Sequence, residues 1–507
     1  MSHNVTESTL PLTESSSELY CDIFCENSEE EYQKALKMAC AYVSKFLKNN
    51  TVPFSGIPSK KLASIINDID LNIPLKSYQS AFEEVKSIYT DHAIAFHLPN
   101  YIAHLNCPVL IPALAAEVLI SAINSSQDTY DQSTGGTYIE RKLINWTANL
   151  IGFDPNCDGV FNSGGSQSNL MGLLLARDQY AFKYLKHNIK LDGNPTEASK
   201  FRIFTSEKSH FSNLKNSSLM GLGEQAVIRV KTDDNFKIDT DLLEEAIIKE
   251  RKLGNIPIAV IATAGTTDFG NIDPLVDLGR IAQTYGLWYH IDAAYGCGLL
   301  LAKKYRHLLN GIELADSVTV DYHKSFFQPI SSSALIVKSK YDLNIVKHHA
   351  DYLNPKNDDE FPSQVNKSII QVTRRFDALK LWFSLRLLGK DKLGKYTEEL
   401  IETAKKTALF MDAQNDLELL CHSDLGALVF RYLPQNCKKY NPCALNRYIK
   451  KTLFSEGKIL LASTKVNDLF YLKFTIVNPL TKLHHIKNIV KIIKKHGQEY
   501  LQSIRNK

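Results

Sequence analysis

Three side chains capable of chemistry lie at the ends of two apolar segments of this chain. The segment "LWYHIDAA" contains Asp292, and "SVTVDYHK" ends in His323 and Lys324. An interior carboxylate or ammonium group needs a partner, because burying it unpaired costs several kcal/mol. A lysine after an apolar run is more often a surface residue, and an aspartate there is often a helix N-cap. The adjacent histidine and the strand-end setting favour a chemical role.

A buried lysine loses proton affinity and can form a Schiff base with an aldehyde. The aldehyde cofactor that fits is pyridoxal phosphate, whose ring nitrogen needs an acidic partner. In this interpretation Lys324 binds the aldehyde carbon and Asp292 keeps the ring nitrogen protonated. The small side chains of Ala293 and Ala294 allow a flat ring to lie close to the backbone.

The phosphate of such a cofactor needs backbone N–H groups at a helix start. The run "NSGGSQSNLMGLLLAR" predicts that arrangement, with Gly165 for close approach and Ser166 for a hydroxyl at the positive end of a helix. A second glycine pair, "GLGEQA" at 221–226, imitates a dinucleotide-binding turn. It lacks the preceding buried strand and the following helix that such a turn requires, which argues against NAD binding.

Two further side chains follow predicted strands. His210, in "FTSEKSHFSNLK", is interpreted as an imidazole stacked on the cofactor ring, although a neutral core histidine is an equal alternative. Thr266, in "IATAGTTDFGNID", is close enough to a strand end to contact the ring or its phenolic oxygen; the alternative is an ordinary strand-to-loop turn.

Composition excludes several classes of protein. The 507 residues are 44% hydrophobic and 22% charged, as in a globular protein, and a net charge of +4 is too small to indicate a nucleic-acid partner. Nine dispersed cysteines without zinc-ligand spacing indicate reduced thiols and no metal site. The polar, acidic N-terminus is not expected to be a signal peptide, and the longest apolar stretch, 110–123, is too short to span a membrane. We therefore expect a cytoplasmic protein.

The order of elements predicts an α/β fold. Residues 1–18 are expected to form a disordered tail, and 19–100 an N-terminal helical segment. Apolar strands alternating with helices in 101–370 predict a mostly parallel central sheet covered by helices, which binds ligands at the carboxyl ends of its strands. Residues 366–389 are expected to form one long helix, and Asp241 with Glu244 a capping box. The remainder, 371–507, is predicted to be a small α+β domain.

These motifs together resemble the group II pyridoxal-phosphate-dependent amino acid decarboxylases, the family of the aromatic-amino-acid and glutamate decarboxylases. The resemblance is carried by "SGGSQSNL", "SHFS", "ATAGTTDFG", "HIDAAYG" and "DYHK" in this order. It extends from "HLPNYIAHLNCP" at 97–108 to "RRFDALKLW" at 374–382, and more weakly to 472–479.

The resemblance implies a fold-type-I homodimer with an active site at the subunit interface, whose N-terminal helices wrap the partner. It also implies that Lys324 holds the cofactor aldehyde, Asp292 the ring nitrogen and His210 the ring face. By the same resemblance Gly165 and Ser166 bind the phosphate, Ala294 packs under the ring, and Thr266 and His323 contact the cofactor or substrate. His104 and Asn106 would face the substrate.

One feature departs from the family pattern. Relatives often carry a tyrosine shortly before the "RR" helix that is thought to protonate Cα, and the corresponding "FPSQVNKSIIQVTRR" has none. Tyr352 and His210 are therefore both candidates for the proton donor.

The phrases "YIAHLNCP" and "DYHKSFFQP" are most similar to bacterial L-2,4-diaminobutyrate decarboxylases of diamine and siderophore biosynthesis. That substrate is expected, giving 1,3-diaminopropane, against aromatic amino acids, glutamate, aspartate or ornithine. The same motifs would also suit an enzyme with another fold-type-I activity, such as aminotransfer, or a catalytically silent paralogue.

Overall fold

A computed structural model describes residues 22–354, 362, 364, 366–435 and 440–505. It divides into two compact units, Met1–Ala95 with Phe454–Lys458, and Phe96–Leu453 with Ile459–Lys507. The disordered tail expected at 1–18 lies outside the described residues. Within those residues no helix is both long and apolar enough to cross a membrane.

The first unit is helical, as the sequence predicts. Its helices are α2 (Glu29–Asn49), α3 (Ser59–Asn67), α4 (Tyr78–Val85) and the short η1 (Lys86–Thr90). Helix α2 begins with three glutamates, which favour the positive end of the helix dipole. Tyr42 of α2 stacks on Phe82 of α4, with ring centroids 4.9 Å apart. Few other side chains of this unit are buried, and Leu71 and Ile73 are largely exposed.

The second unit contains a seven-stranded sheet in the order β2-β8-β7-β6-β5-β3-β4. The strands from β7 to β4 in this order are parallel to one another, and β8 is antiparallel to the strands on both of its sides. The predicted mostly parallel α/β sheet is thus confirmed. The strands are β2 (Asp158–Asn162), β3 (Phe201–Ser206), β4 (Val227–Val230), β5 (Ile256–Thr263), β6 (Trp288–Asp292), β7 (Ser317–Asp321) and β8 (Ser333–Val337).

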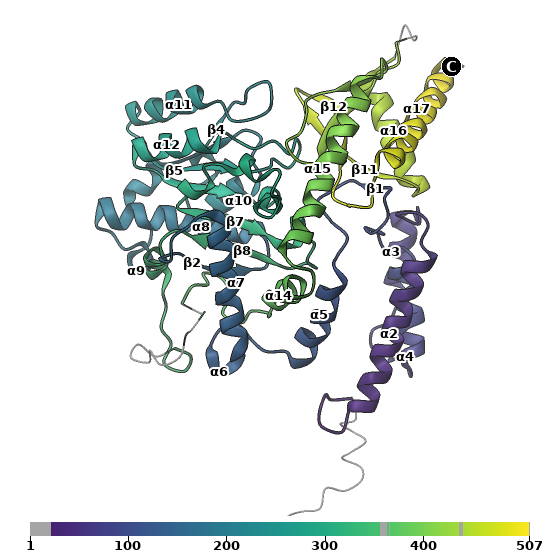
Figure 1. Cartoon of the computed structure of the whole chain (residues 1–507), viewed down its shortest axis with the longest axis horizontal. Helices are drawn as coiled ribbons and strands as arrows, with labels where there is room; N and C mark the ends of the chain where they lie inside the picture. Colours follow the sequence, from purple (N-terminus) through teal and green to yellow (C-terminus); the bar gives the residue numbers. More distant parts are fainter. Residues whose placement is uncertain (1–21, 355–361, 363, 365, 436–439, 506–507) are drawn as a thin grey trace, which may run out of the picture. The chain divides into compact units, whose positions relative to one another are not determined.

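Helices cover both faces of this sheet (Figure 1). Helix α8 (Gly165–Tyr180) packs on one face, while α7 (Gly135–Ile151), α11 (Thr240–Lys252) and α12 (Leu275–Tyr285) share a core with the other. Neighbouring strand residues alternate between the two cores: Ile203 belongs to the α8 side and Phe204 to the opposite side. The strands are therefore apolar throughout, as expected of a sheet buried on both faces.

A smaller five-stranded sheet has the order β1-β11-β12-β10-β9. Strand β1 pairs in parallel with β11, and all other pairs are antiparallel. The strands are β1 (Tyr101–Ile102), β9 (Leu417–Leu419), β10 (Ala427–Tyr432), β11 (Leu460–Val466) and β12 (Leu469–Thr475). The helices of this region are α15 (Lys390–Asp412), α16 (Pro442–Glu456) and α17 (Leu483–Arg505). The remaining α-helices are α5 (Ile111–Ile123), α6 (Tyr130–Ser133), α9 (Ile189–Asp192), α10 (Ser212–Leu219), α13 (Tyr322–Ser325) and α14 (Ala378–Leu388).

Two local predictions were wrong. The long helix expected over 366–389 is only α14, Ala378–Leu388. The backbone before it lies along another segment, because the Arg374 carbonyl accepts a hydrogen bond from the Gln127 N–H (2.8 Å) and its guanidinium pairs with buried Glu140 (3.0 Å). The helix α11 is capped by Asp239, whose side chain accepts from the Leu242 N–H, and not by Asp241.

Candidate active site

The functional candidates gather where three adjacent parallel strands end. Strands β5, β6 and β7 end at Thr263, Asp292 and Asp321. Thr263 lies opposite Asp292, and Asp292 opposite Thr319, so the three ends form one edge of the sheet. The short helix α13 begins directly after β7 and carries Lys324. The sheet therefore brings Asp292 and Lys324 to the same edge, as the sequence predicts.

Lys324 forms an ion pair with a residue from its own strand end. Its Nζ lies 2.8 Å from Oδ2 of Asp321, whose side chain is 1% exposed. Burial alone would lower the pKa of Lys324, but the charge of Asp321 and the hydrogen bond to it outweigh burial and raise that pKa. Oδ1 of Asp321 is buried and has no hydrogen-bond partner among the described residues.

His323 contacts the same carboxylate. Its Nε2 lies 3.6 Å from Asp321 Oδ2, and its Nδ1 lies 2.8 Å from the Ser332 carbonyl oxygen, to which it donates. Burial lowers the pKa of His323 more than the Asp321 charge raises it. A neutral ring with its hydrogen on Nδ1 leaves Nε2 as an acceptor beside the lysine–carboxylate pair.

Asp292 is held by two donors. Its Oδ1 accepts from the Ala294 N–H (3.1 Å), and its Oδ2 from Nδ2 of Asn169 on helix α8 (2.8 Å). The side chain is buried, and both bonds fix its orientation at the end of β6. Each carboxylate oxygen keeps a lone pair for a further donor such as a protonated ring nitrogen.

The other atoms of the Asn169 amide extend this network into the sheet. Its Oδ1 lies 3.1 Å from Nε2 of the fully buried His290, and the Nδ1 of His290 lies 2.8 Å from the Ser317 hydroxyl oxygen. Burial lowers the pKa of His290 to about 4. The neutral ring donates from Nε2 to Asn169 and accepts from Ser317 at Nδ1, so both of its nitrogens are satisfied.

His210 follows β3 and lies within the field of Asp292 and Lys324. Its Nδ1 accepts from the Ser212 backbone N–H (3.2 Å) and lies 2.9 Å from the Ser212 hydroxyl. Burial lowers its pKa, and the Asp292 charge opposes that effect only in part. The neutral ring therefore carries its hydrogen on Nε2, which is free to act as a donor.

The glycine turn also meets this edge. Helix α8 begins at Gly165, with Ser166 exposed beside it. A Cβ on Gly165 would lie 2.7 Å from Oδ2 of Asp321, so only glycine permits this approach. The space, the exposed N–H groups of the helix start and the Ser166 hydroxyl suit a phosphate.

Several buried polar atoms near the edge have no partner among the described residues. They are Oγ1 of Thr266, Oδ1 of Asp321, Oδ1 of Asn162 and Oγ of Ser332. Unsatisfied buried polar atoms are rare in folded proteins and call for a bound group. Together with the paired lysine, the oriented carboxylate of Asp292 and the Gly165 opening, they fit pyridoxal phosphate.

Three predicted residues lie outside this cluster. His104 and Asn106 follow β1, the strand that belongs to the smaller sheet, and nearby Lys473 and Lys450 help to lower the pKa of His104, although burial is the larger cause. Tyr352 is 85% exposed. Of the stretch that follows it, residues 355–361, 363 and 365 lie outside the described residues.

Three residues of the site had no role in the sequence interpretation. Asp321 and Asn169 stand inside the motifs "DYHK" and "SGGSQSNL", and His290 lies two residues before Asp292. Asn169 is four residues after Gly165, one helical turn away, so the helix start that faces the edge also presents Asn169 to it. That spacing is the signal in the sequence that points to Asn169.

Comparisons with known proteins identify a matching domain family and similar chains. Residues 63–433 match the pyridoxal-dependent decarboxylase conserved domain. The L-2,4-diaminobutyrate decarboxylase of Acinetobacter baumannii is 36% identical over 92% of this chain and 93% of its own length. The enzyme of the same name from Rhizobium meliloti (strain 1021) is 34% identical over 88% of both chains.

A solved structure is also similar. The glutamate decarboxylase domain of diaminobutyrate-pyruvate transaminase and L-2,4-diaminobutyrate decarboxylase from Vibrio parahaemolyticus superposes with a TM-score of 0.87. It is 33% identical in sequence and covers 96% of this chain and 100% of that chain.

Proposed function

Because the chain belongs to the pyridoxal-dependent decarboxylase family, we propose that it converts L-2,4-diaminobutyrate to 1,3-diaminopropane and carbon dioxide. Family membership makes the protein a carboxy-lyase that acts on an amino acid with pyridoxal phosphate. The substrate rests on one observation: two relatives with this named activity match about nine-tenths of the chain. Aromatic amino acids, glutamate, aspartate and ornithine are the competing substrates.

Bound pyridoxal phosphate supplies an electron sink that accepts the electrons of the broken Cα–carboxylate bond. Lys324 is proposed to hold its aldehyde carbon. The Nζ must give up a proton before it can attack, and Asp321 Oδ2, 2.8 Å away, is placed to hold that proton. The same carboxylate keeps the amine charged and oriented while the lysine is free.

Asp292 is proposed to bond the ring nitrogen, with Asn169 and the Ala294 N–H fixing the carboxylate in place. Ala294 leaves room under the ring, and His210 is proposed to cover its other face. The Nε2–H of His210 is also one candidate for delivering the proton to Cα, with Tyr352 as the other, since the neutral ring already carries that hydrogen.

Gly165 and Ser166 are proposed to bind the phosphate at the start of α8. Thr266 and His323 would contact the cofactor or the substrate. The unpartnered Oγ1 of Thr266 and the acceptor Nε2 of His323 support these roles. His104 and Asn106 are retained as substrate-side candidates on sequence similarity alone.

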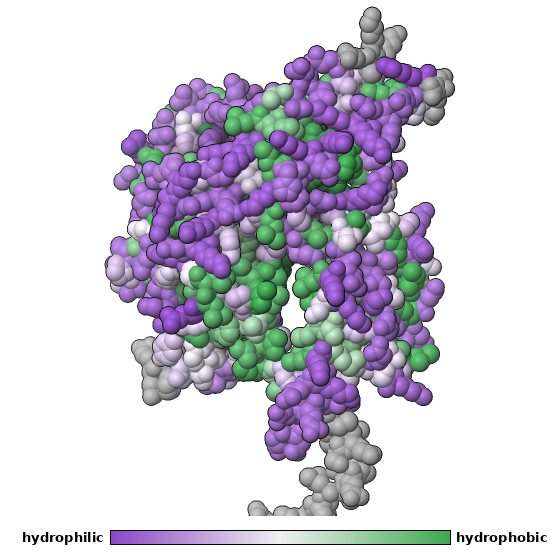
Figure 2. Space-filling model, turned by 45° about the vertical axis from the view of Figure 1, so that its right-hand side comes forward, coloured by the Kyte–Doolittle hydropathy of each residue, from purple (hydrophilic) through white to green (hydrophobic). Residues whose placement is uncertain are grey.

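We propose a homodimer with the active site at the subunit interface. Hydrophobic residues form broad areas on the face drawn in Figure 2. On helix α5 three exposed hydrophobic side chains, Ile111 (79% exposed), Leu114 and Val118, make one stripe at helical spacing. A stripe this apolar supports burial by a second subunit.

We place the enzyme in the cytoplasm, in the supply of diamines including those used for siderophores. The described cysteines are free thiols, as in reducing compartments. The pathway rests on sequence similarity to bacterial diaminobutyrate decarboxylases.

The deciding experiment is a substrate panel on the purified protein, following carbon dioxide release and the amine product. L-2,4-diaminobutyrate is expected to give the highest kcat/KM, ahead of ornithine, glutamate, aspartate and aromatic amino acids. A higher value for another amino acid would refute the substrate. Release of keto acid or peroxide without carbon dioxide would indicate aminotransfer or oxidation, whereas no turnover together with no near-visible cofactor absorption would indicate a silent paralogue.

A further inference from the structure

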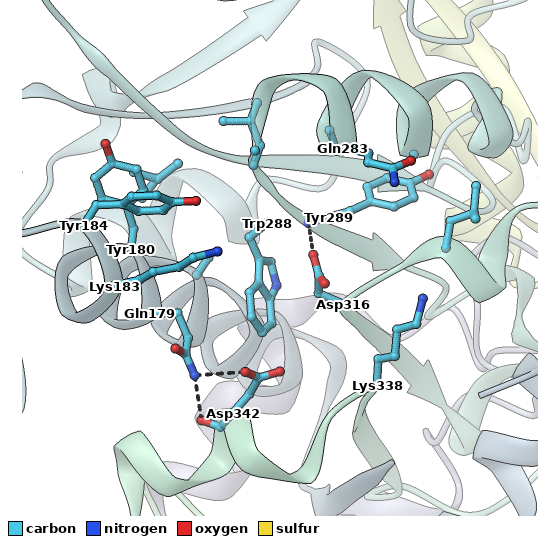
Figure 3. Close-up of a pocket in the computed structure, with 17 residues that line it drawn as sticks. Gln179, Tyr180, Lys183, Tyr184, Gln283, Trp288, Tyr289, Asp316, Lys338 and Asp342 are labelled. Carbon is cyan, nitrogen blue, oxygen red and sulfur yellow. Dashed lines mark hydrogen bonds between the residues drawn. The ribbon is translucent and has the colours of Figure 1, made fainter. Parts of the chain in front are cut away.

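A cavity of about 480 Å³ is drawn in Figure 3. It lies at the opposite end of the large sheet from Asp292 and Lys324. It is lined by residues at the starts of strands, including Ile258 of β5, Trp288 of β6 and Asp316, which precedes β7. This volume is within the range of small-molecule sites. The proposed decarboxylation uses none of these residues.

The cavity is lined by charges of both signs that do not pair with one another. Asp316 and Asp342 supply carboxylates, and Lys183 and Lys338 supply ammonium groups (Figure 3). None of the four takes part in an ion pair within the described residues. Lys338 Nζ donates one hydrogen bond to the Glu313 carbonyl (3.0 Å) and keeps two further N–H donors, and both lysines lie close enough to act on Asp316 through their charge.

Each carboxylate has capacity for a further donor. One oxygen of Asp316 accepts from the Tyr289 N–H (2.7 Å), and one oxygen of Asp342 from Nε2 of Gln179 (3.0 Å). In the described part of the chain the second oxygen of each accepts no hydrogen bond. Burial, assisted by the Asp316 charge, raises the pKa of Asp342 to about 6, which indicates that no cation compensates the charge of Asp342.

Aromatic side chains form the apolar part of the wall. The indole of Trp288 lies in Figure 3 between Lys183 and the two aspartates, and Tyr180 and Tyr184 lie together with ring centroids 4.8 Å apart. Aromatic faces attract ammonium groups and cover hydrocarbon. The wall therefore suits an organic ion with an aliphatic body.

Trp288 is also the first member of a hydrogen-bond chain that reaches Asp292. Its Nε1–H donates to the Ser317 hydroxyl (2.9 Å), which in turn donates to Nδ1 of His290 (2.8 Å). His290 donates to Oδ1 of Asn169 (3.1 Å), and Nδ2 of Asn169 donates to Asp292 (2.8 Å). All donors and acceptors agree in direction, so a change at Trp288 alters the bonds that orient Asp292.

We propose that this cavity is a second ligand site for a small α-amino acid with an ammonium group on its side chain, and that its occupancy is transmitted to Asp292 along this hydrogen-bond chain. The two carboxylates receive the two ammonium groups, the lysines receive the carboxylate, and Trp288 covers the aliphatic body. A simple diamine would leave the lysines without a counter-charge, and a simple anion would leave the aspartates without one. The site does not depend on which amino acid is decarboxylated.

Binding is tested by calorimetry on the holoenzyme with L-lysine as the probe. We expect saturable binding that weakens at least tenfold in the double variant Asp316→Asn/Asp342→Asn. The control Asp277→Asn, an exposed carboxylate on α12 outside the cavity, should bind as the wild type does. Unchanged binding in the double variant, or no binding by the wild type, would overturn the site.

The ligand class is tested with two probes that each lack one charged group. Cadaverine lacks the carboxylate, and L-norleucine lacks the side-chain ammonium group. Both are expected to bind at least tenfold more weakly than L-lysine. Equal binding of cadaverine would show a diamine site, and equal binding of norleucine would show that Asp342 takes no cation; either result overturns the proposed class.

Transmission is tested by the near-visible absorption of the bound cofactor. L-lysine is expected to change this absorption in the wild type but not in Trp288→Phe, which keeps an aromatic wall and removes the indole donor. Calorimetry on the same variant should still show L-lysine binding. A spectral change that survives in Trp288→Phe, or is absent from the wild type, would overturn the connection to Asp292.

Discussion

The neutral state of His290 has a measurable consequence for stability. Its ring is fully buried between β6 and α8, and its two nitrogens are committed to Asn169 and Ser317. Burial lowers its pKa from 6.5 to about 4. As the pH falls, the His290 ring therefore takes up a proton at a lower pH in the folded protein than in the unfolded chain.

The sign and size of the stability change follow from the difference between the pKa of His290 in the folded protein and in the unfolded chain. Above pH 6.5 the ring is neutral in both states, and its contribution to stability is fully present. Between pH 6.5 and about 4 only the unfolded chain takes up the proton, so stability falls. At about 1.4 kcal/mol per pKa unit, the loss from this residue is about 3 kcal/mol.

The test compares the wild type with His290→Gln, which cannot titrate but keeps a donor and an acceptor. Urea unfolding from pH 7.5 to pH 4 gives the difference in unfolding free energy between the two proteins, in which other titrating groups largely cancel. The wild type's advantage should shrink by about 3 kcal/mol over this range. The control His307→Gln replaces an exposed histidine, and its difference in unfolding free energy from the wild type should stay constant over this pH range. A constant difference for His290→Gln would refute a buried neutral ring.

Three further outcomes are expected. Lys324→Ala should abolish carbon dioxide release while the thermal unfolding midpoint stays close to that of the wild type, and retained turnover would exclude Lys324 as the cofactor lysine. Gly172→Ala should destabilise the fold by about 1–3 kcal/mol in the same urea titration, because the new Cβ would lie 2.6 Å from Nδ1 of His290. In the control Gly135→Ala the new Cβ meets nothing within 4 Å, and stability should change little. Asp321→Asn should lower the pKa of Lys324, because it removes the largest effect that opposes burial. Cofactor attachment, followed by near-visible absorption, would then extend to lower pH, and an unchanged pH profile would contradict the pairing.

The sheet and the place of Asp292 and Lys324 could be predicted because two simple rules suffice. Apolar segments of five to eight residues separated by helices indicate a parallel sheet, and the carboxyl ends of parallel strands share an edge. A polar residue that follows such a segment must therefore lie at that edge. The positions of Asp292 at the end of β6 and of Lys324 just after the end of β7 follow from spacing in the chain, and the structure shows both.

The hydrogen-bonded surroundings of these residues could not be predicted in the same way. That Asn169 reaches both Asp292 and His290 depends on how closely α8 packs on β6, and Gly172 permits that approach. The prediction of one helix over 366–389 was wrong for a related reason. The apolar spacing of these residues is helical, but the Arg374–Glu140 ion pair and the hydrogen bond from the Gln127 N–H to the Arg374 carbonyl hold the backbone in another path. Tertiary contacts outweigh local preference here.

Asp321 shows why a motif can be recognised while its electrostatics are missed. In the sequence it is the last residue of a strand, and nothing nearby marks it as more than a strand end. In the fold it approaches both Lys324 and the space left by Gly165, so one carboxylate faces the proposed cofactor lysine and the proposed phosphate position. A carboxylate beside a phosphate is tolerable only if a positive charge or a donor stays between them. Lys324 supplies that charge while it is free. Once its nitrogen is engaged, a hydrogen on the Asp321 carboxyl must take over, and the acceptor Nε2 of His323, 3.6 Å from Asp321 Oδ2, is placed beside that hydrogen.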